Sequence, residues 1–166
     1  MRRTMFKKFY NSYLAYVLVY TFYFLSFALF SSLISVYMLG LGFSAGQTSV
    51  VVSVAFFASM LAQPIMGILN DRLSIKKVTL FSFGAIIFIA IYFMQVRDLL
   101  GLTIGYSLVI MLINGVNPVM DVLAARSPYT YGKIRIWGTI GYALGSQLAG
   151  VLYQYVSPMA IFIAFI

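Results

Sequence analysis

Two charged residues near the ends of long apolar runs are the first candidates for chemistry in this sequence. Asp121 lies near the end of one run, and Arg135 lies near the start of the next. Each is about one helical turn from the nearer end of its run, so the two lie at similar depth. An unpaired charge inside a membrane segment is costly, which makes such a residue a functional candidate by default. Two interpretations stay open: an ion pair across two helices, or an Arg135 that extends to the lipid headgroups beside an Asp121 at a hydrated helix end.

Few other residues could support catalysis. The sequence has no His and no Cys, and its carboxylates are Asp71, Asp98 and Asp121, in three different segments. Imidazole bases, thiolate nucleophiles and the usual zinc ligands are therefore missing. This composition argues against an enzyme and predicts neither a metal nor a cofactor.

Long apolar runs are the elements that would position these residues. The chain is 63% hydrophobic and 8% charged, whereas soluble proteins carry about 25% charged residues. A membrane-spanning helix needs about 20 apolar residues, and the runs that we assign are 12–40, 46–70, 77–96, 101–124, 134–156 and the shorter 158–166. The pattern predicts an all-α polytopic membrane helix bundle in one domain, 1–166, with five full transmembrane helices and an incomplete sixth. The chain would then be a fragment or a truncated product.

The basic residues predict the orientation of the bundle. The net charge of +8 could suggest nucleic acid in a soluble protein, but here the charges sit between apolar runs and nucleic acid is not expected. Lys and Arg accumulate in cytoplasmic loops. They gather at the N-terminus and in the second and fourth connections: Arg2, Arg3, Lys7 and Lys8, then Arg72, Lys76 and Lys77, then Arg126 and Lys133, with Arg135 just inside the next helix. We therefore expect a multi-pass protein of the cell membrane with a cytoplasmic N-terminus.

Helical spacing sorts the polar residues onto faces. Residues three, four and seven apart share one face of a helix. The run 101–124 carries one polar stripe, made of Thr103, Ser107, Asn114, Asn117 and Asp121. The run 134–156 carries a second stripe, made of Arg135, Thr139, Tyr142, Ser146 and Tyr153, beside the small residues Gly138, Gly141 and Gly145. Small residues at this spacing let helix backbones approach closely, so Arg135 should face protein rather than lipid.

The first run carries a third stripe, which is aromatic: Tyr13, Tyr16, Tyr20, Tyr23, Phe24, Phe27 and Ser31. Aromatic residues are common in membrane helices, and ordinary packing is the interpretation that we favour from the residues alone. The alternative is a ring surface beside a substrate path. The run 77–96 has almost no polar stripe and is expected to be peripheral and lipid-exposed.

The stretch QPIMGILNDRLSIKK, Gln63 to Lys77, could simply be a basic inside loop with a turn, but it resembles the signature loop of the major facilitator superfamily. Ser74 stands where that pattern has its second glycine, and Gln63-Pro64 and Leu73 are similar to the lactose-permease-like branch. The matching residues are Gly67, Leu69, Asp71, Arg72, Lys76 and Lys77. The resemblance implies a conformational gate formed by Gly67, Asp71, Arg72, Lys76 and Lys77.

The stretch NPVMDVLAARSPYTYGKIRIWG, Asn117 to Gly138, is similar to the same branch. The shared pattern is Pro118-x-x-Asp121, a short basic loop, and then Tyr131-Gly132-x-x-Arg135-x-Trp137-Gly138-x-x-Gly141. By this resemblance Asp121 and Arg135 face a central cavity and engage the solute. Tyr142 stands where that branch has a Trp that stacks on a sugar ring. The remaining substrate-binding candidates are Asn117, Tyr20 and Phe27.

The resemblance also implies a function. Such transporters have two six-helix bundles that rock around a solute near the bilayer midplane, and this chain would be the N-terminal bundle. We expect secondary active, proton-coupled uptake of a small polar solute such as a sugar, with the lipid bilayer, protons and a second six-helix half as partners. Two alternatives remain: a non-transporting fragment or half that needs a partner half, and a nucleoside or aromatic acid as the solute.

Overall fold

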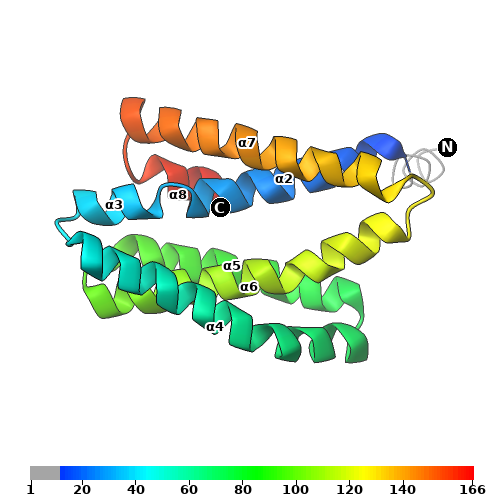
Figure 1. Ribbon diagram of the computed structural model, residues 1–166, viewed down its shortest axis with the longest axis horizontal. Helices are drawn as coiled ribbons and strands as arrows, with labels where there is room; N and C mark the ends of the chain where they lie inside the picture. Colours follow the sequence, from blue (N-terminus) through cyan, green and yellow to red (C-terminus); the bar gives the residue numbers. More distant parts are fainter. Residues whose placement is uncertain (1–11) are drawn as a thin grey trace.

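The computed structural model describes residues 12–166, except for the side chains of residues 70, 71 and 75. The fold is all-α, as expected, and the described residues contain no strand (Figure 1). The helical segments are α2 (Tyr13–Ser31), α3 (Ile34–Gly40), α4 (Ala45–Arg72), α5 (Ile75–Gln95), α6 (Leu99–Ala125), α7 (Tyr131–Tyr155) and α8 (Ala160–Phe165).

Four segments among the described helices are long and apolar enough to cross a membrane. They are Tyr13–Gly40, which joins α2 and α3, Ala45–Leu69, Lys76–Gln95 and Leu99–Ala125. The fifth expected span falls on α7, which is less apolar because it carries Lys133, Arg135 and several glycines. Composition therefore supports four spans, and a crossing by α7 stays a prediction.

The first apolar run is interrupted, although the sequence predicted one continuous helix over 12–40. The break falls at Ser32 and Leu33, where Leu33 has φ −110° and ψ 14°. Immediately before the break, the Ser31 hydroxyl donates to the Phe27 carbonyl, one turn back, at 2.8 Å. Serine hydroxyls that bond back to the preceding turn often bend helices, which accounts for the break. The other segments, α8 included, begin and end within three residues of the apolar runs.

Local capping explains why several helices begin where they do. The Ser44 hydroxyl accepts from the Gln47 backbone N–H at 3.2 Å, and the Gln47 side chain accepts from the Ser44 N–H at 2.9 Å. Asp98 caps α6 by accepting from the Gly101 N–H at 2.8 Å. Each bond satisfies a backbone group that a helix start leaves unpaired. The carboxylate of Asp98 thus has a structural role.

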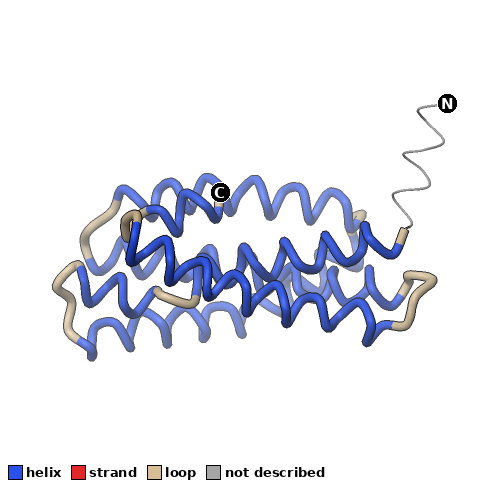
Figure 2. Tube along the Cα trace, turned by 90° about the horizontal axis from the view of Figure 1, so that it is seen from above, coloured by secondary structure: helices blue, strands red, loops and turns tan. Residues whose placement is uncertain are grey.

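The helices lie side by side along the long axis of the molecule, in two groups (Figures 1 and 2). In one group α7 and α8 pack on α2, and in the other α4 and α5 pack on α6. The groups meet where α2 contacts α6, and an aromatic cluster fills the core near one end: Phe30, Phe93, Tyr106 and Phe162. The expected peripheral helix 77–96 is α5, which packs mainly on α6 and exposes Leu80, Phe81 and Phe88.

A glycine seam brings α7 against α2. A Cβ added at Gly141 would lie 2.3 Å from the Thr21 carbonyl oxygen, and one at Gly145 would lie 2.4 Å from that of Leu25. These distances are shorter than any real Cβ contact, so the two backbones approach as closely as glycine allows. Gly138 continues the seam beneath the ring of Phe24.

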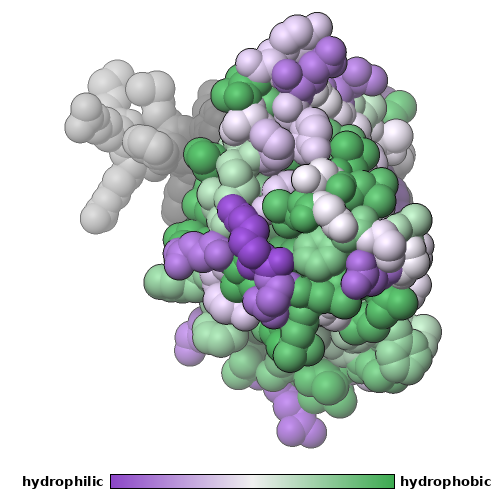
Figure 3. Space-filling model, turned by 90° about the vertical axis from the view of Figure 1, so that its left-hand side faces the viewer, coloured by the Kyte–Doolittle hydropathy of each residue, from purple (hydrophilic) through white to green (hydrophobic). Residues whose placement is uncertain are grey.

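The two ends of the bundle differ in charge. The α4–α5 and α6–α7 connections and the start of α2 lie at one end (Figure 1), where the chain carries Arg72, Lys76, Arg126 and Lys133. At the opposite end hydrophilic and hydrophobic residues are mixed on the surface (Figure 3). There the Arg97 guanidinium donates to the Tyr37 hydroxyl at 3.2 Å and to the Met94 carbonyl at 2.9 Å.

Candidate functional site

Asp121 and Arg135 meet across the α6–α7 connection. Asp121 lies about one turn before the end of α6, and Arg135 lies in the second turn of α7. The Arg135 Nη1 donates to the Asp121 Oδ1 at 2.8 Å. The side chains stay 56% and 47% exposed, respectively. Of the two interpretations open from the sequence, the structure has the ion pair. A pair this exposed contributes little to the stability of the fold. It does leave a carboxylate and a guanidinium accessible on the surface of the bundle.

Tyr131 completes this pair, and the sequence did not single it out as a site residue. Its hydroxyl donates to the Asp121 Oδ1 at 2.9 Å and accepts from the Arg135 Nη1. The Arg135 Cζ also lies 5.5 Å from the centre of the Tyr131 ring, within the range of a cation–π contact. The spacing could have indicated Tyr131, because it lies four residues before Arg135 and residues four apart share a helix face. We call Tyr131, Asp121 and Arg135 the polar triad.

Asn117 belongs to a polar chain that joins three helices. The Tyr23 hydroxyl of α2 lies 2.6 Å from the Ile113 carbonyl oxygen and 2.9 Å from the Asn117 Oδ1. Asn117 donates to the Asn114 Oδ1 at 3.2 Å, and Asn114 donates to the Ser59 hydroxyl of α4 at 2.8 Å. Asn117 thus lies one turn from Asp121 on α6 but has its side chain engaged within the bundle.

The three aromatic candidates occupy two different environments. Tyr20 is fully buried, and its hydroxyl donates to the Met120 carbonyl at 2.5 Å. It therefore fastens α2 to α6 in this structure. Phe27 and Tyr142 meet edge to face across α2 and α7, with ring centres 5.8 Å apart. Tyr142 is 38% exposed and lies about 10 Å from Arg135 along α7, so it could stack on a solute that reaches the triad.

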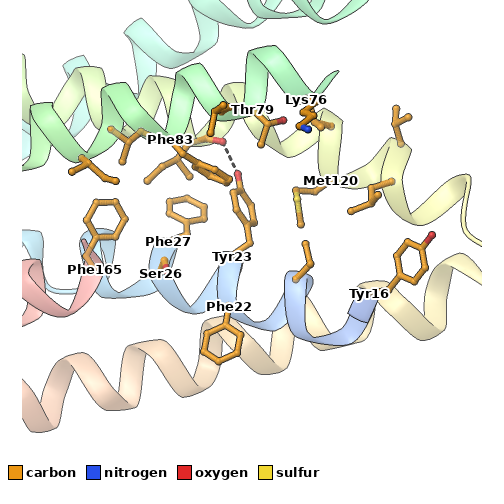
Figure 4. Close-up of a pocket in the computed structure, with 18 of the residues that line it drawn as sticks. Tyr16, Phe22, Tyr23, Ser26, Phe27, Lys76, Thr79, Phe83, Met120 and Phe165 are labelled. Carbon is orange, nitrogen blue, oxygen red and sulfur yellow. Dashed lines mark hydrogen bonds between the residues drawn. The ribbon is translucent and has the colours of Figure 1, made fainter. Parts of the chain in front are cut away.

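A separate cavity is lined by Phe27 but not by the polar triad. It has a volume of about 800 Å³ and lies between α2, α5, α6 and α8 (Figure 4). Its walls are almost entirely apolar, with Phe83 and Phe165 among them and Lys76 at one end (Figure 4). Neither Asp121 nor Arg135 is among the described residues that line it. A sugar needs convergent polar groups, so the polar triad is the better candidate site.

The expected gate residues lie around the α4–α5 connection. Arg72, Lys76 and Lys77 are exposed, and the side chain of Asp71 lies outside the described residues. A Cβ added at Gly67 would meet no described atom within 4 Å. Gly67 therefore has no close helix neighbour among the described residues, and its part in a gate stays a prediction.

Comparison with known proteins places the chain in a family. Residues 5–165 match the family model described as the LacY proton/sugar symporter. Over 162 residues the chain is 29% identical to the sucrose permease of Escherichia coli, covering 89% of this chain and 39% of that protein.

Two further relatives give the same picture. The lactose permease of Citrobacter freundii is 29% identical over 122 residues, 66% of this chain and 29% of that protein. The raffinose permease of Escherichia coli is 29% identical over 133 residues, 73% of this chain and 31% of that protein. No solved structure gives a significant match.

The chain therefore spans between 29% and 39% of the length of these relatives. Its apolar spans and the family match agree on a membrane protein of a transporter family, not an enzyme. The chain belongs to the LacY proton/sugar symporter family of inner-membrane permeases, within the major facilitator superfamily.

Proposed function

We propose that this chain forms the N-terminal helix bundle of a proton-coupled sugar transporter that works by alternating access. The observation that carries this proposal is the ion pair of Asp121 and Arg135, which is half-exposed on the surface of the bundle. In transporters with paired bundles, the solute binds between the two bundles and each bundle contributes one wall. A surface that presents a carboxylate, a guanidinium and the accessible ring of Tyr142 suits one such wall.

The charge balance of the site favours a neutral, hydroxyl-rich solute. Because Asp121 compensates the charge of Arg135 at 2.8 Å, a carboxylate solute would have to displace Asp121 before it could pair with Arg135. Sugar hydroxyls can instead donate to the carboxylate and accept from the guanidinium while the pair stays intact. The names of the relatives, permeases for lactose, sucrose and raffinose, support this choice over an aromatic acid or a nucleoside.

The remaining parts of the proposal concern the complete transporter. A second six-helix bundle supplies the opposing wall and the proton-binding residues, and α7 crosses the membrane as a fifth span. The basic end of the bundle and the start of α2 face the cytoplasm, since Lys and Arg are retained on that side. Gly67, Asp71, Arg72, Lys76 and Lys77 form the gate at that surface.

Uptake by a permease-deficient host that expresses the gene's complete reading frame tests this proposal. We expect accumulation of a neutral sugar, and we expect Arg135→Ala to reduce it at least about tenfold, since hydrogen bonds to charged groups contribute about 1.5–3 kcal/mol. Immunoblots of membranes should show equal insertion. Lys133→Ala is the matched control, because it removes the same charge from another face of α7 and should leave uptake within twofold, roughly the size of a typical exposed-charge effect.

Two results would overturn the proposal. Normal uptake by Arg135→Ala would remove Arg135 from the site. Accumulation of an aromatic acid or a nucleoside, without that of any neutral sugar, would reject the solute class while leaving a transporter.

A further inference from the structure

We propose that Tyr131 is a positioning residue of the sugar site, whose hydroxyl fixes the relative orientation of Asp121 and Arg135. This inference rests on the proposed function for the identity of the solute. The positions of the three side chains can be tested without it.

The contacts of Tyr131 reach both charges at once. Its hydroxyl donates to the Asp121 Oδ1 at 2.9 Å, the same oxygen that accepts from the Arg135 Nη1 at 2.8 Å. It also accepts from that Nη1, and its ring lies beneath the guanidinium, 5.5 Å from the Cζ. One residue therefore contacts both the Asp121 carboxylate and the Arg135 guanidinium.

The pair needs such a constraint. Both charged side chains are about half-exposed, and holding two long side chains in one geometry costs conformational entropy. Within the described part of the chain, the polar partners of Asp121 are Arg135 and Tyr131 alone. Tyr131 is the first residue of α7, directly after the N-cap Thr130. Its backbone is therefore part of the same helix that carries Arg135, one turn further along.

The triad leaves a defined set of groups for the solute. Asp121 receives both of its described donors on Oδ1, and Arg135 uses Nη1 for both of its described bonds. A carboxylate has about four acceptor positions and a guanidinium has five N–H donors. The Oδ2 of Asp121 and the other nitrogens of Arg135 can therefore meet one donating and one accepting hydroxyl, as adjacent hydroxyls of a sugar ring present them. Tyr131 sets the distance and angle between these two contacts.

Substitution by Tyr131→Phe, which keeps the ring and removes the hydroxyl, tests this inference. In the complete transporter we expect KM for the sugar to rise about 3- to 20-fold, the effect of one lost hydrogen bond to a charged group in an exposed site. Vmax and membrane insertion should stay within about twofold, because the fold does not depend on this hydroxyl. Tyr155→Phe is the matched control: it lies on the same helix, is 76% exposed, and should change neither parameter.

A second measurement is independent of transport. Phenylglyoxal modifies free guanidinium groups, and peptide mass spectrometry of the chain in membranes can follow its rate at Arg135. We expect Tyr131→Phe to accelerate modification of Arg135 at least threefold and to leave that of Arg97 unchanged. An unchanged rate at Arg135, or an unchanged or lower KM, would overturn the positioning role. Faster modification in a protein that imports no sugar would uphold the role and reject the proposed function.

Discussion

At the scale of single residues, the charges were predictable and their polar partners were not. Asp121 and Arg135 stand out in the sequence because a bilayer penalises charge, so a charge in an apolar run needs a reason. Tyr131 carries no such signal, since tyrosine is ordinary near a membrane interface. Tyr20 and Tyr23 donate to backbone carbonyls of α6, and a carbonyl is present at every residue. The sequence therefore located the pair but not the hydroxyls around it.

The hydroxyl of Tyr23 should stabilise the contact between α2 and α6. Tyr23→Phe removes a buried donor that lies 2.6 Å from the Ile113 carbonyl and 2.9 Å from Asn117. We expect the free energy of unfolding to fall by about 0.5–1.5 kcal/mol, the usual net value of one hydrogen bond. Unfolding of the purified chain in detergent, followed by circular dichroism, measures the change.

Tyr92→Phe is the control for this substitution. Tyr92 lies on α5 and is 45% exposed, and its hydroxyl has no hydrogen bond among the described contacts. The same loss of stability in both variants would show that the Tyr23 hydroxyl makes no specific contribution.

At the scale of elements, α2 is the helix that holds the bundle together. It contacts α7 through a glycine seam and α6 through tyrosine hydroxyls. The spacing of Gly138, Gly141 and Gly145 predicted a packing face, and the structure supplies the partner that spacing cannot name. The break between α2 and α3 was not predicted, because hydropathy is continuous through Ser31 and a serine within an apolar run does not show whether its hydroxyl will bond back to the preceding turn.

Gly141→Ala should weaken the packing of α7 on α2. The new Cβ would lie 2.3 Å from the backbone oxygen of Thr21, so the helices must separate, and we expect a loss of about 1–3 kcal/mol in the free energy of unfolding. Gly150→Ala in the same helix meets no atom within 4 Å and should gain up to about 1 kcal/mol from helix propensity. The same detergent unfolding assay compares the two variants. If both lower, or both raise, the free energy of unfolding, close packing at Gly141 does not stabilise the bundle.

At the scale of the whole molecule, the described bundle has a basic end, apolar flanks and an exposed polar triad. Composition and the positions of the basic residues predicted a membrane helix bundle, and four spans among the described helices agree with it. The proposed gate around Asp71 follows from the resemblance and not from residue spacing, because a basic loop with a turn has the same composition. What the bundle does contain is a carboxylate and a guanidinium joined at 2.8 Å on an accessible face.

A double-mutant cycle on sugar affinity in the complete transporter tests most directly whether Asp121 and Arg135 act as one binding unit. Asp121→Asn, Arg135→Gln and the double variant are compared by equilibrium binding of a labelled sugar. Each single variant should weaken binding about tenfold or more. Because either change removes the paired geometry, the double variant should bind the sugar almost as well as the single variant with the lower affinity. Losses that multiply, or a single variant that binds like the unaltered protein, would contradict a shared site.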